Sequence, residues 1–362
     1  MLLQLIKPLT LALMVALAFG QLGRLPGFPQ TLNVYAFDVV ILVLILVWLL
    51  ASSFGGPGVK LRLDGVKRAA LYFAAAALAS WMAVRPEFPL NEWLAGGAYL
   101  ARWLLYFGLY LIFTDPRVKK LKIPLKDYMT GLALALGAIG LIQYFVLPDT
   151  RWLFFSGWDD HYYRVIGSLG DPSFLGLMLL LGLILSRQWL LLITLFLTYS
   201  RSTYLAVVAV MTAAASFKRA WRMLAVGLLA LAVVLPLLPR PGGEGVNLLR
   251  LFSIEQRFDN YREGIALWSR SPLLGVGFNM LRSVRGDFLS HAASGVDNSF
   301  IFVAATAGFI GLMAYLNLLR RLWQSGSQIL KLSLVAVIVH AFFQNSLFYP
   351  EVMIWLWLTA AL

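Results

Sequence analysis

The sequence contains no cysteine, which excludes a disulfide framework and any metal site built on Cys ligands. Other groups of metal ligands are scarce too. Asp159, Asp160 and His161 are adjacent, but no second ligand cluster accompanies them, so we interpret them as part of a solvated loop. We expect neither a metal ion nor another cofactor.

Charged residues are also few, at 13% of the 362 residues, whereas 60% are hydrophobic and apolar runs recur from end to end. This composition predicts an all-α polytopic membrane protein. The 30 Lys and Arg residues exceed the 17 Asp and Glu residues, yet no basic domain lies outside the apolar runs. The excess therefore indicates cytoplasmic loops rather than nucleic-acid binding.

The apolar runs predict about twelve transmembrane helices in a single domain, residues 1–362. The expected spans are 9–19, 34–53, 69–84, 93–113, 128–147, 174–185, 190–199, 203–217, 223–238, 298–318, 329–347 and 352–362. The first 19 residues resemble a signal peptide, but no small-residue cleavage site follows, so we expect a first span there.

Alternate loops are short and rich in Lys and Arg, at 60–68, 117–126, 218–222 and 320–321. Cationic loops of this kind stay on the cytoplasmic side of a membrane. We therefore expect both termini inside and the long 239–297 loop outside.

The 239–297 loop contains a predicted amphipathic helix at about 254–270. Ser253 and Gln256 have the capping-box spacing, and Ser271-Pro272 ends the helix because a residue before proline leaves the helical region. The apolar stripe of this helix consists of Ile254, Phe258, Tyr261, Ile265 and Trp268. Such a helix lies on a bilayer surface, with its stripe toward lipid or the bundle and its arginines toward water or an anionic substrate.

The predicted outer loops carry arginine but no lysine. These arginines are Arg151, Arg164, Arg201, Arg240, Arg250, Arg257, Arg262, Arg270, Arg282 and Arg285. Arginine contacts phosphate or carboxylate through two donors at once, whereas topology alone does not distinguish the two cations. We therefore expect an anionic substrate on the outer side; headgroup anchoring, or chance, is the alternative.

Arg201 interrupts the apolar stretch 188–217, within the sequence Tyr199-Ser200-Arg201-Ser202-Thr203. At about 1.5 Å per residue, neither half of the stretch comfortably crosses roughly 30 Å of hydrocarbon. The turn is therefore expected below the outer surface beside a water-filled cavity, which marks a functional site. The alternative is an arginine that snorkels to the outer headgroups.

The outer loop 148–173 is rich in Trp and Tyr, and Gly170-Asp171-Pro172 closes it. Aromatic side chains form interfacial belts and also stack on sugar rings, so both interpretations stay open. Two polar residues lie inside predicted spans. Arg102 is a further site candidate, and His340 is interpreted as a hydrogen-bond partner between helices.

Four phrases, read in order, resemble the O-antigen ligase and O-antigen polymerase superfamily, membrane glycosyltransferases of the GT-C type. They are RVIGSLGDPSFLG at 164–176, LTYSRSTYLAV at 197–207, RFDNYREGIALWSRSPLLGVGFNM at 257–280 and DNSFIFVAATAGFIGL at 297–312. The resemblance covers roughly residues 160–350, and the first 150 residues add only hydropathy.

This resemblance implies a GT-C-like bundle in the bacterial plasma (inner) membrane, with its active site on the extracytoplasmic side. The implied donor is a glycan linked to undecaprenyl diphosphate, the acceptor is a hydroxyl of a glycan or of lipid A core, and no metal or nucleotide sugar is needed. A diphosphate leaving group requires cationic donors, which Arg201 and Arg257, supported by Arg164 or Arg262, could supply.

The chain departs from the family where ligases have His followed by Asn, because Asp297 precedes Asn298 here. Asp297 could act as the base that a sugar hydroxyl needs, or it could cap the next helix. His291, six residues upstream, is the other candidate base, and neither residue acting is the third possibility. The missing His favours a polymerase, or a ligase of another glycan, over a lipopolysaccharide ligase.

Three functional hypotheses therefore follow. The first is an outer-face glycosyltransferase that acts as a polymerase, or alternatively as a ligase to lipid A core or another acceptor. The second is a transporter or flippase of polyprenyl-linked glycans, which predicts paired broken helices in two repeats, whereas the sequence has one broken pair and no repeat. The third is a non-catalytic member of the family.

Overall fold

The computed structural model describes residues 2–27, 32–53, 63–156, 160–249, 252–287 and 291–362, and within them the chain is helical, with two isolated β-bridges and no strand. The all-α prediction is therefore confirmed. Isolated bridges pair Arg24 with Tyr35 and Asp149 with Tyr162, where loops meet.

The α-helices, in chain order, are α1 (Ile6–Phe19), α2 (Ala36–Ser53), α3 (Gly65–Ala83), α4 (Leu90–Thr114), α5 (Pro116–Lys119), α6 (Leu125–Val146), α7 (Pro172–Ser186), α8 (Leu190–Phe196), α9 (Arg201–Lys218), α10 (Trp221–Leu237), α11 (Phe252–Arg270), α12 (Leu281–Arg285), α13 (Ser299–Ser325), α14 (Gln328–Ala341) and α15 (Pro350–Ala361). The 3-10 helices are η1 (Leu2–Leu5), η2 (Gly20–Gly23), η3 (Arg85–Glu87), η4 (Arg151–Ser156), η5 (Gly167–Leu169), η6 (Glu244–Val246), η7 (His291–Ser294) and η8 (Ser346–Phe348).

Each predicted span overlaps one helix, and most ends agree within four residues. Helix α13 continues to Ser325, beyond the predicted end at 318, and α14 ends at Ala341, before the predicted end at 347. Among the described residues, five segments are long and apolar enough to cross a membrane: Leu2–Gly23, Gly65–Glu87, Leu90–Thr114, Leu125–Val146 and Ser299–Ser325. Helices α2, α7, α10 and α14 are apolar but shorter. The chain thus has the helices of a multi-pass membrane protein, and the number of about twelve crossings stays a prediction.

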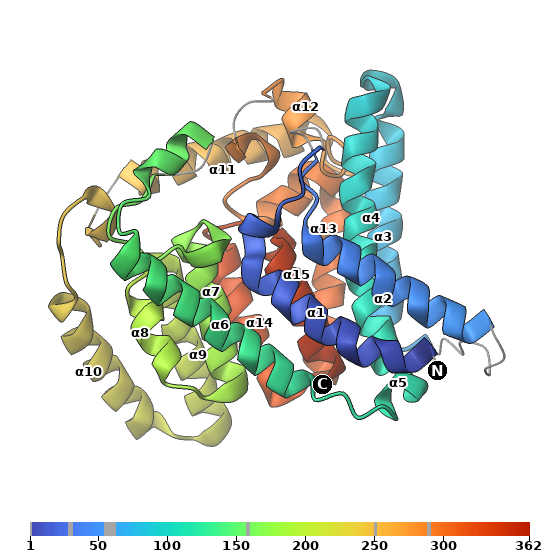
Figure 1. Cartoon of the computed structure of the whole chain (residues 1–362). Helices are drawn as coiled ribbons and strands as arrows, with labels where there is room; N and C mark the ends of the chain where they lie inside the picture. The colour runs from blue at the N-terminus through green and yellow to red at the C-terminus, as the bar shows by residue number, and fades with distance from the viewer. Residues whose placement is uncertain (1, 28–31, 54–62, 157–159, 250–251, 288–290) are drawn as a thin grey trace.

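The helices define two ends of the molecule. Figure 1 shows α5 and both chain termini at one end, which we call the basic end because α5 belongs to a cationic segment. Helices α11 and α12 lie at the opposite end, called here the loop end (Figure 1). This separation of the predicted inner and outer loops is what the positive-inside rule requires.

Helix α13 is broken at Gly308, and the turn that follows α11 fills the break. Gly308 has φ 65° and ψ −169°, so the next two amides turn away from their helical partners. The Phe309 N–H donates to the Pro272 carbonyl at 2.8 Å and the Ile310 N–H to the Leu273 carbonyl at 3.3 Å. The 272–277 turn therefore replaces part of the α13 backbone ladder.

The two carbonyls that lose their helical partners at the break are also paired. The Ala305 carbonyl accepts from the Val276 N–H at 2.8 Å, and the Thr306 carbonyl accepts from the Ser80 hydroxyl of α3 at 2.6 Å. Buried backbone groups are costly when unpaired, so this exchange is what makes the break tolerable in an apolar interior.

Helix α11 begins at Phe252, one residue before the predicted cap. The Ser253 side chain lies outside the described part of the chain, so the capping box stays a prediction. The helix ends at Arg270, as predicted. The apolar stripe divides, because Phe258 and Ile265 are 58% and 51% exposed, whereas Leu267, outside the predicted stripe, is buried. Only part of the stripe therefore packs on the bundle.

We expect Gly308→Ala to destabilise the protein strongly. A Cβ at residue 308 would lie 2.1 Å from the Leu273 carbonyl oxygen, and the backbone has a positive φ. The backbone conformation alone costs a non-glycine residue roughly 1–3 kcal/mol. Thermal unfolding of the detergent-solubilised protein should show a clear drop in Tm.

Gly131→Ala is the matched control, because a Cβ on that helical glycine of α6 meets nothing within 4 Å. Alanine there should leave Tm unchanged or raise it slightly. Equal Tm values for the two variants would contradict the role assigned to Gly308.

Candidate functional site

The turn between α8 and α9 presents Arg201 at a helix start. Ser200 caps α9, since its hydroxyl accepts from the Thr203 N–H at 3.3 Å, and Tyr199 before it has φ 50°. The break in the apolar stretch is thus confirmed as a turn between two helices. Arg201 follows the cap directly and is half-buried.

Arg164 supports this turn from the aromatic loop. Its side chain is buried, and its guanidinium donates to the Thr198 carbonyl at 3.0 Å and toward the Tyr199 carbonyl at 3.5 Å. Alongside, the Val165 N–H donates to the Leu197 carbonyl at 3.0 Å. These contacts fit a residue that positions the Arg201 turn, and diphosphate binding by Arg164 stays a prediction.

Arg201 lies within electrostatic range of Arg257, and their like charges repel. The Arg201 guanidinium donates to the Leu248 carbonyl at 3.4 Å. Arg257 is half-buried on α11 and forms no hydrogen bond or ion pair with the residues that the structure describes. Guanidinium groups are the donors that proteins use to bind phosphate and carboxylate, so this pair of residues is the candidate anion site.

The Asp297-Asn298 pair lies where α13 begins, and Asn298 is the cap. The Asn298 side-chain oxygen accepts from the Phe300 N–H at 2.9 Å and the Ile301 N–H at 3.1 Å. The alternative that Asp297 caps the helix is therefore wrong: Asn298 already satisfies the two amides that a cap serves. The Asp297 N–H donates to the Asn260 side chain of α11 at 2.7 Å, which fixes its backbone.

Tyr261 lies within electrostatic range of both Arg257 and Asp297. Burial raises the pKa of Tyr261 above its ordinary value, Arg257 opposes the rise and Asp297 adds to it. The phenol is therefore neutral at pH 7, and it donates a hydrogen bond to the Phe342 carbonyl at the end of α14. Sequence analysis placed Tyr261 only in an apolar stripe, because the periodicity carries no sign of its polar contact.

Arg285 of α12 holds the segment before Asp297. It donates to Glu263 of α11 at 2.9 Å, to both carboxylate oxygens, and to the carbonyls of Ala293 and Gly295 at 2.8 Å each. The sequence shows Arg285 only as one of many outer arginines. Its partner is 22 residues away, a separation that no helical spacing predicts.

The other predicted site residues are placed differently. Arg262 is on the solvent side of α11, where its side chain is 82% exposed and pairs with Asp259 at 3.2 Å. The structure therefore does not bring Arg262 to the Arg201–Arg257 pair. His291 begins η7, three residues before Ser294, and its side chain lies outside the described part of the chain.

His340 forms the predicted contact between helices. One ring nitrogen lies 3.1 Å from the Ser202 hydroxyl of α9 and the other 2.6 Å from the Ser346 hydroxyl of η8. The imidazole is fully buried. It connects the start of α9, next to Arg201, to the segment after α14.

Arg102 is part of a buried ion pair away from the arginine pair. Its guanidinium lies 3.0 Å from Asp38 of α2, and the Tyr106 hydroxyl donates to the same carboxylate at 2.5 Å. The guanidinium also lies 5.0 Å from the centre of the Tyr99 ring. Arg102 thus faces the bundle interior.

An apolar groove of about 510 Å³ runs along α13 and α14. It is lined by Phe300, Leu312, Leu316, Leu319, Arg320, Trp323, Leu334, Ile338 and Phe342. At one end, Phe300 and Phe342 stand 5.1 Å apart between ring centres, next to the Asn298 cap. At the other end are Trp323 and Arg320, in the cationic 320–321 segment. One groove therefore connects the neighbourhood of Asp297 to the basic segment.

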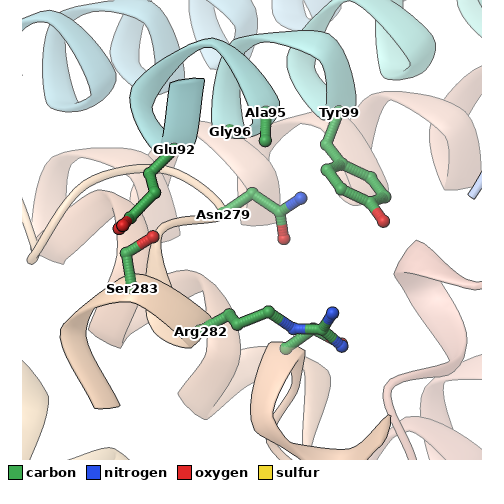
Figure 2. Close-up of a pocket in the computed structure, with 8 residues that line it drawn as sticks. Glu92, Ala95, Gly96, Tyr99, Asn279, Arg282 and Ser283 are labelled. Atoms are coloured by element: carbon green, nitrogen blue, oxygen red, sulfur yellow. The ribbon is translucent and has the colours of Figure 1, made fainter. Parts of the chain in front are cut away.

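A second, small polar hollow lies at the loop end, between α4 and α12. Figure 2 shows the side chains of Glu92, Tyr99, Asn279, Arg282 and Ser283 around it. Ser294, from the segment that Arg285 holds, completes the lining. No group of three or more His, Asp or Glu residues suited to a metal ion occurs among the described residues.

These features define a helical multi-pass membrane protein with paired cations and an acid beside the start of one long helix. Residues 188–316 match the family model described as O-antigen ligase. The match includes the Arg201 turn, α11, the 272–277 turn and the Gly308 break, and it confirms the resemblance to the O-antigen ligase and polymerase superfamily. No curated protein shows significant similarity to this chain.

We expect Arg285→Ala to loosen the segment before Asp297 without unfolding α13. The substitution removes charge-assisted hydrogen bonds, each of which contributes about 1.5–3 kcal/mol. Amide hydrogen exchange of residues 293–297 should become at least about tenfold faster, since 1.4 kcal/mol corresponds to a factor of ten.

The control for this measurement is Arg270→Ala, which removes an exposed arginine at the end of α11. It should leave exchange of 293–297 unchanged. Unchanged exchange in Arg285→Ala would show that other contacts hold the segment.

Proposed function

We propose that the protein transfers a glycan from polyprenyl diphosphate, of the undecaprenyl type, to a hydroxyl of an acceptor glycan. The loop end then faces the outer side of the bacterial plasma membrane, and both termini are cytoplasmic. The observation that carries the proposal is that Arg257 of α11 lies within electrostatic range of Arg201 at the start of α9, while Arg257 and Asp297 both act on Tyr261.

The chemistry of this transfer matches the residues of the site. The bond between the sugar C1 and the diphosphate oxygen breaks, a bond from C1 to the acceptor oxygen forms, and the acceptor proton leaves. Negative charge develops on the diphosphate, where paired guanidinium groups stabilise it most effectively. Asp297 is the proposed base that takes the proton. Tyr261 is neutral and donates its proton to the Phe342 carbonyl, so it is not the base that takes the acceptor proton.

The apolar groove supports a polyprenyl carrier. From Phe300 to Trp323 the axis of α13 rises roughly 34 Å, at about 1.5 Å per residue, which is comparable to the hydrocarbon core of a bilayer. Its near end lies beside the Asn298 cap. A diphosphate between Arg201 and Arg257 would therefore leave its prenyl chain directed along the groove.

Alanine at Arg201 or Arg257 is expected to weaken binding of the lipid-linked donor by about tenfold or more, since each charged hydrogen bond contributes roughly 1.5–3 kcal/mol. The purified protein in nanodiscs is given polyprenyl-diphosphate oligosaccharide, and donor binding and release of polyprenyl diphosphate are both followed. Arg270→Ala, on the same helix as Arg257, is the control that should bind donor normally.

The two readouts separate the hypotheses. Release that requires an acceptor glycan and disappears in Arg201→Ala supports a transferase. A donor that binds through the arginines and is never consumed would instead support a transporter or a non-catalytic protein. Normal donor binding in both arginine variants would remove the observation on which the proposal rests.

We expect Asp297→Asn to leave donor binding intact and to slow acceptor-dependent release by about 10²–10⁴-fold, the usual contribution of a general base. The amide cannot take the acceptor proton but keeps the size of the side chain. The Asn variant is compared with His291→Ala, the other candidate. Undiminished transfer in the double variant would disprove both assignments of the base.

A further inference from the structure

The last residue pair of α14 and the segment that follows it, residues 340–347, contact all three elements of the proposed site. We call this segment the α14 end. Its Phe342 carbonyl accepts a hydrogen bond from the Tyr261 hydroxyl of α11 and, at 3.4 Å, from the Asn298 side chain at the start of α13. The helix that carries Arg257 and the start of α13 are therefore attached to the same carbonyl group.

The third element, the turn that carries Arg201, is attached to the α14 end through His340. The His340 Nε2 atom lies 3.1 Å from the Ser202 hydroxyl of α9, and Nδ1 lies 2.6 Å from the Ser346 hydroxyl. Ser202 follows Arg201 directly in the sequence. His340 also lies within electrostatic range of Arg257. The α14 end thus connects both arginines of the proposed donor site.

We propose that His340 is a positioning residue, which holds Arg201 in a fixed place relative to Arg257 and Asp297. The ring is fully buried and each of its nitrogens has a hydroxyl partner, so it acts through Ser202 rather than on the substrate. Its role in transfer rests on the proposed function, whereas the positioning of the Arg201 turn is measured without transfer.

The hydrogen bonds continue from Ser202 into the cap of α9. The Ser202 hydroxyl lies 3.1 Å from the hydroxyl of Ser200, which caps the helix, and the Thr203 hydroxyl donates to Ser200 at 2.9 Å. All three side chains are buried, so none of them can exchange a lost partner for water without cost. A connected network of this kind favours a single arrangement of the turn.

The network supports the Arg201 turn on the side opposite to a second set of contacts in sequence, those of Arg164 with the Thr198 and Tyr199 carbonyls. Arg164 holds the residues before Arg201, and His340 holds the residue after it. Without the His340 contact, Arg201 is fixed from one direction only. A displacement of about 1 Å at a reacting centre can cost 10²-fold in rate, so small movements of this turn are expected to affect transfer.

The first test uses two substitutions that separate the two hydrogen bonds of His340. The amide of asparagine lies near the position of Nδ1, whereas the longer side chain of glutamine reaches the position of Nε2. His340→Asn should therefore keep the contact with Ser346 and lose that with Ser202, and His340→Gln should do the reverse. Because each variant loses one buried hydrogen bond and the ring, we expect similar decreases in Tm.

Only His340→Asn is expected to impair the site. Donor binding should weaken by about tenfold or more, the cost of an unpaired buried group. Acceptor-dependent release of polyprenyl diphosphate at saturating donor should fall by about 10²-fold. His340→Gln should keep most of both. Ser333→Ala is the matched control, because it removes a buried hydroxyl of the same helix that has no hydrogen-bond partner among the described residues.

The second test measures the position of α9 without donor or acceptor. Because the chain has no cysteine, Leu205→Cys on α9 and Ala266→Cys on α11 provide two unique and exposed sites for spin labels. Pulsed electron paramagnetic resonance of the full-length protein in nanodiscs gives the distribution of distances between the labels. We expect His340→Asn to broaden or shift this distribution, and His340→Gln and Ser333→Ala to leave it unchanged.

The outcomes distinguish this proposal from the proposed function. A changed distance distribution and weaker donor binding in His340→Asn, but not in His340→Gln, support positioning even if no donor is consumed. Equal losses in the two variants overturn it, because His340 then only stabilises the bundle. Normal donor binding and release in His340→Asn also overturn it and leave the transferase intact. If His340→Asn does not fold, Ser202→Ala removes the same hydrogen bond and is judged by the same criteria.

Discussion

The loop end of this protein depends on one exchange of backbone hydrogen bonds, at the break of α13. A helix interrupted in an apolar interior leaves two amides and two carbonyls without partners, at a cost of several kcal/mol if they stay so. Here the 272–277 turn and Ser80 take all four. Only glycine permits this at position 308, because the Leu273 carbonyl occupies the space of a side chain. The exchange attaches the end of α11 to α13. This attachment fixes the positions of Arg257, Tyr261 and α12 relative to Asp297.

The charges of the protein are arranged in two contrasting ways. Arg102 and Arg117 each lie within 3.0 Å of a carboxylate, Asp38 or Asp115, so their cost of burial is offset within the protein. Arg257 has no such partner in the described part of the chain, and it lies within electrostatic range of a second guanidinium, that of Arg201. A fold gains nothing from bringing two cations together. The arrangement is understandable when a bound dianion such as a diphosphate supplies the missing charge, which is the physical argument for the proposed donor.

Hydropathy was sufficient to place the helices, and the polar interruption at Tyr199–Thr203 was sufficient to find the Arg201 turn, because both signals are local. The details that the sequence left open depend on tertiary contacts. Asp297 and Asn298 are both good caps, and only the backbone shows that Asn298 takes the role. Phe258 and Ile265 belong to the stripe by spacing, yet the bundle covers neighbouring positions instead. The sequence also assigned Arg164 and Arg262 alike to the donor; one is buried against the turn and the other pairs in solvent.

The elements of the proposed donor site are of two kinds. The arginines belong to α9 and α11, whereas the groove belongs to α13 and α14 and is mainly apolar. A transferase that uses a prenyl carrier needs such a division, since the carrier must stay in lipid while the glycan stays in water.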